Sequence, residues 1–191
     1  MNEISLHILD IVQNSIAAGA SHITVEVVED EAGDRLTITV ADDGKGMDTE
    51  TAERVLSPFA TSRTTRRVGL GIPLFREGCL ACDGDFSIES VPGRGTTVRA
   101  CYRMSHIDRP PLGNLSETVF LLIASNPELD FTFRHGEGDR SYELSTEELR
   151  QTLGEVPITE PGVLQWIREY LDESELNLHG GANPYEDDTG A

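Results

Sequence analysis

Two oxygen-bearing side chains near the N-terminus are the first candidates for chemistry. Asp10 and Asn14 are four residues apart within residues 3–18, where apolar residues recur at helical spacing, so they would share one helix face. A carboxylate beside an amide carbonyl can hold a divalent ion that prefers oxygen ligands, and can place a base near a nucleophile. Alone, the pair is better explained as a solvated helix face.

The loop DDGKGM, residues 42–47, follows a segment that alternates like a strand. Gly44 and Gly46 would let the backbone approach a flat ligand, and the Asp42 carboxylate could accept a hydrogen bond from an exocyclic amine. The same carboxylate would face the carbonyl oxygen of guanine unfavourably, so such a site would select adenine. A tight turn that needs glycine is the alternative, and it is favoured for this motif alone.

The segment SPFATSRTTRRVGLGIPL, residues 57–74, combines glycines with cations. Gly69 and Gly71 precede a predicted helix, whose free N-terminal amides attract phosphate. Its three arginines are Arg63, Arg66 and Arg67. Arginines this close together favour a local anion site, although a solvated loop explains the segment equally well when it is taken alone.

These candidates sit between elements that the pattern predicts over the first 104 residues. The helix over 3–18 precedes a hairpin, and a helix from about Gly71 to Gly84 precedes a second hairpin. The expected strands are 23–29, 35–41, 86–91 and 96–103, with a short helix over 48–56.

The remaining residues form a second region after a linker, residues 105–115, that contains Pro110 and Pro111. Ser116 is a candidate N-cap for a helix to Ser125, and DFTFRH and RSYEL predict a hairpin. The further expectations are a capping box of Ser145 and Glu148 for a helix to Leu153, a helix over 161–171, and a disordered acidic tail over 180–191.

The charge of the chain excludes some partners. It carries 34 acidic and 15 basic residues, a net charge of −19, so binding to nucleic acid or a membrane through a broad basic patch is not expected. Residues 1–104 are net −6 and residues 105–191 net −13, which predicts two regions with different roles. The acidic N-terminus is unlike a signal peptide and no apolar run reaches membrane-span length, so we expect a cytoplasmic protein.

Taken in order, the motifs of residues 1–104 resemble the GHKL superfamily of type II topoisomerases, heat-shock chaperones, histidine kinases and mismatch-repair ATPases. LHILDIVQNSIAAGASHITVEV is similar to the asparagine box, DDGKGM to the first glycine box, and PFATSR with VGLGI to the lid and second glycine box. GRGTTVRA is similar to the closing strand. The resemblance implies an α/β two-layer sandwich, the Bergerat ATP-binding fold, with a mixed, mostly antiparallel sheet backed by helices. A small α+β region, residues 116–179, would follow it.

The resemblance also implies roles for matching residues, with ATP and Mg²⁺ as cofactors. Asn14 would ligate magnesium, Asp42 would read the adenine amine, and Asp10 would stand where related branches carry a glutamate base. The other implied nucleotide-binding residues are Gly44, Gly46, Met47, Thr61, Ser62, Arg63, Gly69, Leu70, Gly71, and Thr96 or Thr97 behind Asp42.

The sequence departs from the family pattern at three points. Aspartate at position 10 is one methylene shorter than glutamate, and Arg67 stands where a glycine often opens the second glycine box. Nothing before the asparagine box resembles a dimerisation helix with a phosphoacceptor histidine. His7 is better explained as a packing or surface histidine than as a hydrogen-bond partner of Asp10. The pair Cys79 and Cys82 is better explained by ordinary burial than as a redox or zinc half-site.

The leading hypothesis is a Mg-ATP-binding regulatory protein with slow hydrolysis or phosphotransfer, which reports its nucleotide state to a protein partner through residues 108–191. One alternative is a serine protein kinase like the anti-sigma factors, or a histidine kinase acting in trans. The other is a non-catalytic nucleotide-binding subunit, since short proteins of this pattern resemble those encoded beside iron hydrogenase or related redox subunits.

Overall fold

A single six-stranded sheet forms the centre of the molecule. The computed structural model describes residues 3–56 and 71–181. The strand order is β3-β4-β2-β1-β5-β6, and all neighbours are antiparallel except the parallel pair β1 and β5. The strands are β1 (His22–Asp30), β2 (Arg35–Asp42), β3 (Asp85–Val91), β4 (Gly95–Arg103), β5 (Asp130–Glu137) and β6 (Arg140–Ser145).

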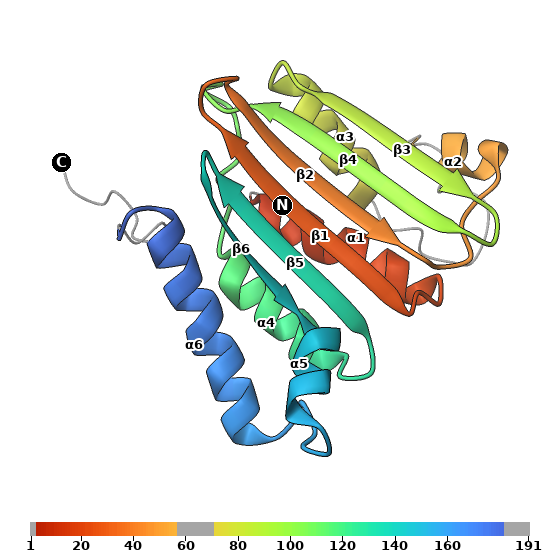
Figure 1. Cartoon of the computed structure of the whole chain (residues 1–191). Coiled ribbons are helices and arrows are strands. Elements are labelled where there is room, and N and C mark those ends of the chain that lie inside the picture. Colours follow the sequence, from red (N-terminus) through yellow and green to blue (C-terminus); the bar gives the residue numbers. More distant parts are fainter. Residues whose placement is uncertain (1–2, 57–70, 182–191) are drawn as a thin grey trace.

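Helices form the second layer. They are α1 (Ile4–Ala17), α2 (Thr49–Val55), α3 (Gly71–Ala81), α4 (Leu115–Ser125), α5 (Thr146–Leu153) and α6 (Pro161–Leu178). Helices α1, α3 and α4 lie behind the sheet in Figure 1, and α6 runs along the β6 side. This mixed, mostly antiparallel sheet backed by helices confirms the predicted two-layer α/β sandwich.

The core lies between the sheet and α1. Along β1 and β2, alternate residues such as Val25 and Ile38 are buried, because successive strand side chains point to opposite faces. From α1, Ile4, Ile8 and Ile11 cover that face. The 3.6-residue period of the helix and the two-residue period of the strands therefore meet in one apolar layer.

The C-terminal region shares this sheet and core. β5 pairs with β1, and the buried core cluster includes Phe131 and Leu171 as well as Ile8. The carbonyls of Pro111 and Leu112 accept hydrogen bonds from the N–H groups of Ile4 and Ser5, at 3.0 and 2.8 Å. The expected linker thus satisfies free amides at the start of α1. The strands before and after residues 105–115 belong to one sheet.

Two predicted helix ends differ from those in the structure. Asn114, not Ser116, caps α4 by accepting a hydrogen bond from the Glu117 N–H at 2.8 Å. The Ser116 hydroxyl instead donates to Asp172 of α6, at 2.6 Å. Helix α6 continues to Leu178 because Leu171, Glu175 and Leu178 extend its buried face through a run of polar residues.

The predicted N-cap of the helix after β6 agrees with the structure. Ser145 caps α5 by accepting from the Glu148 N–H at 3.4 Å. No helix among the described residues is long and apolar enough to cross a membrane. Residues 182–191 of the expected tail lie outside the described residues.

Candidate functional site

The carboxylate of Asp42, at the end of β2, is held by three uncharged donors. The Ser15 hydroxyl donates to Oδ2 at 2.6 Å, and the N–H groups of Gly44 and Thr96 donate to Oδ1 at 2.9 and 3.3 Å. These contacts orient the carboxylate without neutralising it. A charged acceptor of fixed direction results, suited to an amine or amide donor of a ligand.

The loop after Asp42 is fastened at its start by Asp43. The Asp43 carboxylate accepts hydrogen bonds from the Ser21 hydroxyl and N–H, at 2.5 and 2.7 Å, and from the His22 N–H at 2.9 Å. The Ser21 hydroxyl, followed by the His22 amide, holds the pKa of Asp43 below its usual value. The loop is thereby tied to the turn between α1 and β1.

Packing requires glycine at position 46 of this loop and leaves little room for a side chain at position 44. A Cβ on Gly44 would lie 3.0 Å from Asp42 Oδ1 and 3.1 Å from the Ala18 Cβ. Gly46 has a φ of +63°, and a Cβ there would lie 2.0 Å from the Val91 carbonyl oxygen. At Gly46 the loop therefore approaches the neighbouring backbone more closely than any other residue type allows.

Ser90 connects the far end of the loop to β4. Its hydroxyl accepts from the Met47 N–H at 2.8 Å and lies 2.8 Å from the Thr96 hydroxyl. Thr96 thus joins the network behind Asp42. Thr97 pairs with Ala41 and, by strand alternation, faces the other side of the sheet.

Asp10 and Asn14 are partly exposed and one turn apart on α1. Gly71, the first residue of α3, packs on Asp10 so closely that a Cβ would lie 2.9 Å from Asp10 Oδ2. Within the described residues, no hydrogen bond occupies the side chain of either Asp10 or Asn14. Their oxygens fit a hard cation such as Mg²⁺, which takes few protein ligands and keeps several waters.

Five predicted site residues lie outside the described residues. They are Thr61, Ser62, Arg63, Gly69 and Leu70. Arg66 and Arg67 of the expected anion site lie there as well.

Three residues of this network were missed by the sequence analysis: Ser15, Asp43 and Ser90. Ser15 had a usable signal, because it interrupts the apolar stripe of the first helix and is buried there. A buried hydroxyl requires a partner, and Asp42 provides it. Asp43 and Ser90 act through backbone contacts across the sheet, which the sequence does not display.

His7, Cys79 and Cys82 serve packing. His7 stacks on Phe75 with ring centroids 5.1 Å apart, and burial lowers the His7 pKa. Cys79 and Cys82 are free thiols in the core. Burial raises the pKa of Cys79 to about 11, so this thiol is neutral and unreactive at physiological pH.

The fold and this arrangement define a class of protein. The sequence profile described as "Histidine kinase-, DNA gyrase B-, and HSP90-like ATPase" matches residues 2–106, more than half of the chain. The chain belongs to this family. The expected asparagine box, glycine loop and closing strand correspond to α1, residues 42–47 and β4, which lie together in the fold.

Individual relatives come from two branches of the family. The chain is 36% identical over 89 residues to "Sensor protein kinase FleS" of Pseudomonas aeruginosa, covering 47% of this chain and 22% of that protein. It is 29% identical over 166 residues to "DNA mismatch repair protein MutL" of Anaeromyxobacter dehalogenans, covering 66% and 27%. The chain therefore spans only a fraction of the length of these curated relatives.

A solved structure shares the fold. The structure "Aquifex aeolicus MutL ATPase domain complexed with ADP" aligns with a TM-score of 0.51 at 15% identity, covering 88% of each chain.

Proposed function

We propose that this chain binds Mg-ATP between α1, the loop at 42–47 and the start of α3, and that it signals its nucleotide state to a protein partner. The main observation behind this proposal is the Asp42 carboxylate. Ser15, Gly44 and Thr96 orient it through uncharged donors, so it can pair with a donor group of a ligand. The adenine amine would donate to Asp42. The MutL ATPase domain that shares this fold was solved as a complex with ADP, which supports the assignment.

Isothermal titration calorimetry with Mg-ATP and Mg-GTP tests nucleotide binding. Wild-type protein should prefer ATP, and Asp42→Asn should weaken ATP binding at least about 100-fold, because it replaces a charge-assisted acceptor by an amide that presents donors to the amine. Asp85→Asn is the matched control, since Asp85 is exposed at the opposite end of the β3–β4 hairpin. Equal ATP affinity of wild type and Asp42→Asn would refute the proposal.

Within this proposal, Asn14 ligates Mg²⁺ and Asp10 activates the nucleophile. Magnesium, when bound, neutralises charge on the phosphates. Asp10 accepts a proton from water or from a partner's hydroxyl, and its close packing on Gly71 places it beside the N-terminus of α3. The Asp10 side chain is one methylene shorter than the glutamate of related branches, so we expect slow turnover.

Two variants separate these roles. Asn14→Ala should weaken Mg-ATP binding and reduce its dependence on Mg²⁺. Asp10→Asn should keep ATP affinity but slow phosphate release about 100-fold. Labelled γ-phosphate that appears on a co-purified protein rather than in solution would identify phosphotransfer as the reaction; unchanged turnover in Asp10→Asn would remove Asp10 from the chemistry.

The protein partner would bind to a groove of about 560 Å³ between β6, α5 and α6. Its apolar lining includes Leu149, Val163 and Trp166, and Trp166 is 47% exposed. The acidic side chains Glu143 and Glu148 line it as well, and Glu143 is also paired with Arg134. This combination suits a segment with apolar anchors and flanking lysines or arginines.

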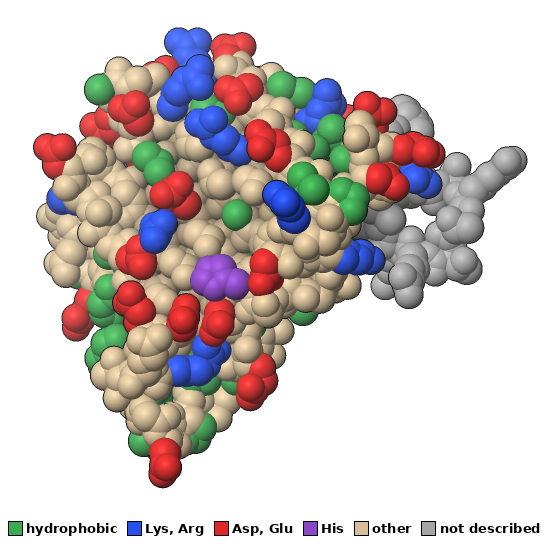
Figure 2. All heavy atoms as spheres, turned by 45° about the vertical axis from the view of Figure 1, so that its right-hand side comes forward, with side chains coloured by type: hydrophobic (Ala, Val, Ile, Leu, Met, Phe, Trp, Pro, Cys, Tyr) green, Lys and Arg blue, Asp and Glu red, His purple; other side chains and the backbone are tan. Residues whose placement is uncertain are grey.

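The charge distribution of the chain favours a protein over a polyanion as its partner. On the face shown in Figure 2, Lys and Arg side chains are interspersed with Asp and Glu and do not form a continuous basic patch. The net charge of the chain, −19, also disfavours polyanions, so nucleic acid and anionic lipid are not proposed as partners.

Point variants test the groove better than truncation, because β5 and β6 belong to the central sheet. Trp166→Ala should abolish capture of the partner that co-purifies with wild-type protein while ATP binding is unchanged. Leu121→Ala is a matched control, an exposed apolar residue on α4 outside the groove. Equal capture by both variants would exclude the groove.

A further inference from the structure

A second cluster of titratable side chains lies at the other end of β1 from Asp42. On the helix-covered face, β1 and β5 place Val25, Val27 and Phe133 in the core. The next positions on the same face are Glu29 and His135. The buried face of these two strands is therefore apolar until its last positions, which carry ionisable side chains. A largely buried charge requires a partner.

His135 is fully buried between two carboxylates. Its Nδ1 lies 2.8 Å from Glu175 Oε1, and its Nε2 lies 3.0 Å from Glu29 Oε1. Burial works to lower the His135 pKa, but the hydrogen bonds to Glu175 and Glu29 outweigh it and raise the pKa to about 9. Glu175, which also accepts from the Tyr142 hydroxyl, orients the ring so that Nε2 faces Glu29.

His179 approaches the same point from the C-cap of α6. Its Nδ1 lies 3.1 Å from Glu137 Oε2, and its Nε2 lies 3.6 Å from Glu175 Oε2. Glu137 Oε2 and His179 Nε2 are buried, and within the described residues their contacts are ion pairs that do not have the geometry of a hydrogen bond. Buried polar atoms are normally satisfied, and the C-terminal end of a helix favours a nearby cation.

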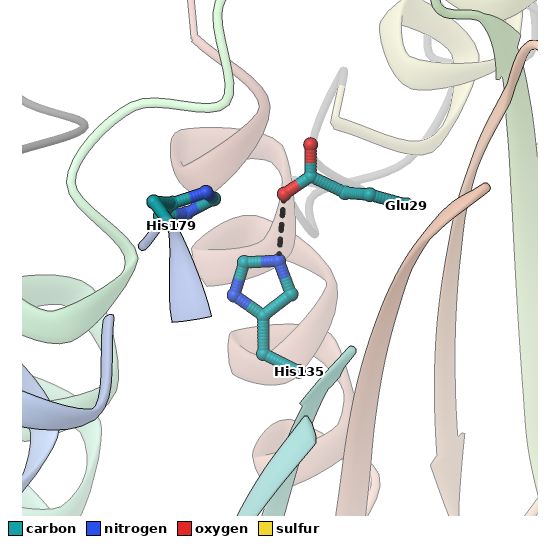
Figure 3. Close-up of side chains that lie close together, drawn as sticks. All are labelled: Glu29, His135 and His179. Carbon is teal, nitrogen blue, oxygen red and sulfur yellow. Dashed lines mark hydrogen bonds and ion pairs between the residues drawn. The ribbon is translucent and has the colours of Figure 1, made fainter. Parts of the chain in front are cut away.

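The geometry points to a metal site: we propose that Glu29, His135 and His179, with Glu137 beside them, bind one divalent transition-metal ion. In Figure 3 the Glu29 carboxylate and both imidazole rings surround a common point. One ligand atom from each of the three residues lies within 4.8 Å of the others. Tetrahedral zinc needs ligand atoms about 3.4 Å apart, so metal binding would draw these atoms together by up to about 1.4 Å.

The donor types agree with such an ion. Two imidazoles and carboxylate oxygens suit zinc and its neighbours in the first transition row, whereas magnesium and calcium prefer oxygen alone. Glu175 behind His135 supplies the carboxylate that commonly orients a metal-bound histidine. On binding, the metal would replace the proton on Nε2 of His135, and that proton would pass to solvent.

An acidic cleft would lead a cation to this site. It has a volume of about 630 Å³ between the turns that join β1 to β2 and β5 to β6. Asp30, Glu31 and Asp139 line it, and Glu137 belongs to both the cleft and the cluster. Arg140 also lines the cleft and pairs with Glu137 at 3.4 Å. Carboxylates still predominate and would raise the local cation concentration.

A bound metal would join three distant parts of the chain. Glu29 belongs to the family-matched region, His135 to β5 and His179 to the end of α6. The ion would therefore fasten α6, and one wall of the proposed partner groove, to the sheet.

Calorimetry with Zn²⁺ and the full chain, freed of metal by a chelator and without nucleotide, tests the site. We expect one ion per chain with a Kd below about 1 μM. Co²⁺ should give the visible absorption of a four-coordinate nitrogen and oxygen site, without a thiolate charge-transfer band. Binding weaker than about 100 μM, or a thiolate band from the three cysteines, would overturn the proposal.

Variants assign the ligands. His179→Ala and Glu29→Gln should each weaken Zn²⁺ binding at least about 100-fold, and Glu175→Gln about 10- to 100-fold. Glu29 and His179 are partly exposed, so these two changes are compatible with folding, which thermal unfolding without metal would verify. Unchanged affinity in both would exclude the site.

Matched controls distinguish it from other candidates. His106→Ala removes a partly exposed histidine outside the cluster. His22→Ala removes a member of a second group, His22, Asp130 and Glu147, and Asn14→Ala removes the proposed magnesium ligand. All three should bind Zn²⁺ like wild type; loss of binding in any of them would place the ion elsewhere. ATP binding retained by His179→Ala would show that this proposal and the proposed nucleotide site stand or fall separately.

Discussion

The two ends of β1 hold carboxylates in opposite ways. At the β1 terminus beside Asp42, one carboxylate is held by a hydroxyl and two backbone N–H groups. At the other terminus, Glu29 and Glu175 face the imidazole of His135. The first arrangement fixes direction and leaves the charge for a ligand. The second balances charge within the protein or with a cation.

This difference predicts which substitutions should lower the stability of the fold and which should mainly weaken ligand binding. Removing a member of a buried ion pair leaves an uncompensated charge, which is far more costly than losing a hydrogen bond to a neutral donor. The His135 cluster should therefore contribute to stability, and the Asp42 network to ligand affinity.

The largest effect is expected at Glu175. Glu175→Gln should lower the free energy of unfolding by about 3 kcal/mol in metal-free buffer, because His135 loses a buried counter-charge. Asp42→Asn should lower it by only about 1 kcal/mol. Urea unfolding gives both values, with Glu173→Gln, an exposed neighbour on α6, as the control. Equal losses of unfolding free energy for Glu175→Gln and Asp42→Asn would contradict the proposed difference between the two ends of β1.

A second effect tests the rigidity of the Asp42 end. Gly46→Ala should lower the free energy of unfolding by about 2 kcal/mol, because it combines a positive φ with a Cβ placed 2.0 Å from the Val91 oxygen. Gly93→Ala is the matched control: its φ is +75°, but a Cβ there meets nothing within 4 Å. Gly93→Ala should cost only about 1 kcal/mol in urea unfolding, and an equal cost for both would exclude the close approach as the reason for glycine.

The Asp42 end was largely predictable from the sequence, since its determinants are local. Asp42, Gly44 and Gly46 stand within one short motif, and the order of motifs identified the family. The strand pairs β1–β2 and β3–β4 are hairpins, for which short turns set the pairing. The fold class followed from these elements.

The His135 end could not be predicted, because its residues meet only through long-range pairing. Glu29 and His135 approach each other through the parallel pairing of β1 with β5, which no local signal specifies. His179 lies beyond residue 171, where the predicted last helix stopped, and the polar run from Asp172 concealed the buried face at Glu175. The sequence consequently suggested a separate C-terminal module where the structure has a continuous sheet.

A third prediction concerns Ser15, which joins stability to affinity at the Asp42 end. Ser15→Ala should weaken Mg-ATP binding about 10-fold by freeing one carboxylate oxygen, and lower the free energy of unfolding by about 1 kcal/mol. Ser5→Ala on the same helix is the control, because Ser5 is equally buried but distant from Asp42. Should Ser15→Ala bind nucleotide like Ser5→Ala, the orientation of Asp42 would not depend on Ser15.

The smallest effect is expected at His7, which is buried as His135 is. Burial lowers the pKa of His7, which has only weak electrostatic help from Asp10 and a ring partner in Phe75. Its folded pKa lies below the unfolded value of 6.5, so the unfolded chain binds more protons as the pH falls through that value. His7 therefore favours the folded state fully above pH 6.5 and progressively less below it.

His7→Leu should remove this contribution. Between pH 7.5 and 5.5, wild type should lose up to roughly 1 kcal/mol more unfolding free energy than His7→Leu, measured by urea unfolding at each pH. His106→Leu, the same change at a partly exposed histidine, is the control. Identical pH dependence in wild type and His7→Leu would mean that the pKa of His7 is the same in the folded and unfolded chain, so that burial does not oppose its protonation. A wild type that loses less unfolding free energy than His7→Leu would mean that the fold raises the His7 pKa, as the carboxylates raise that of His135.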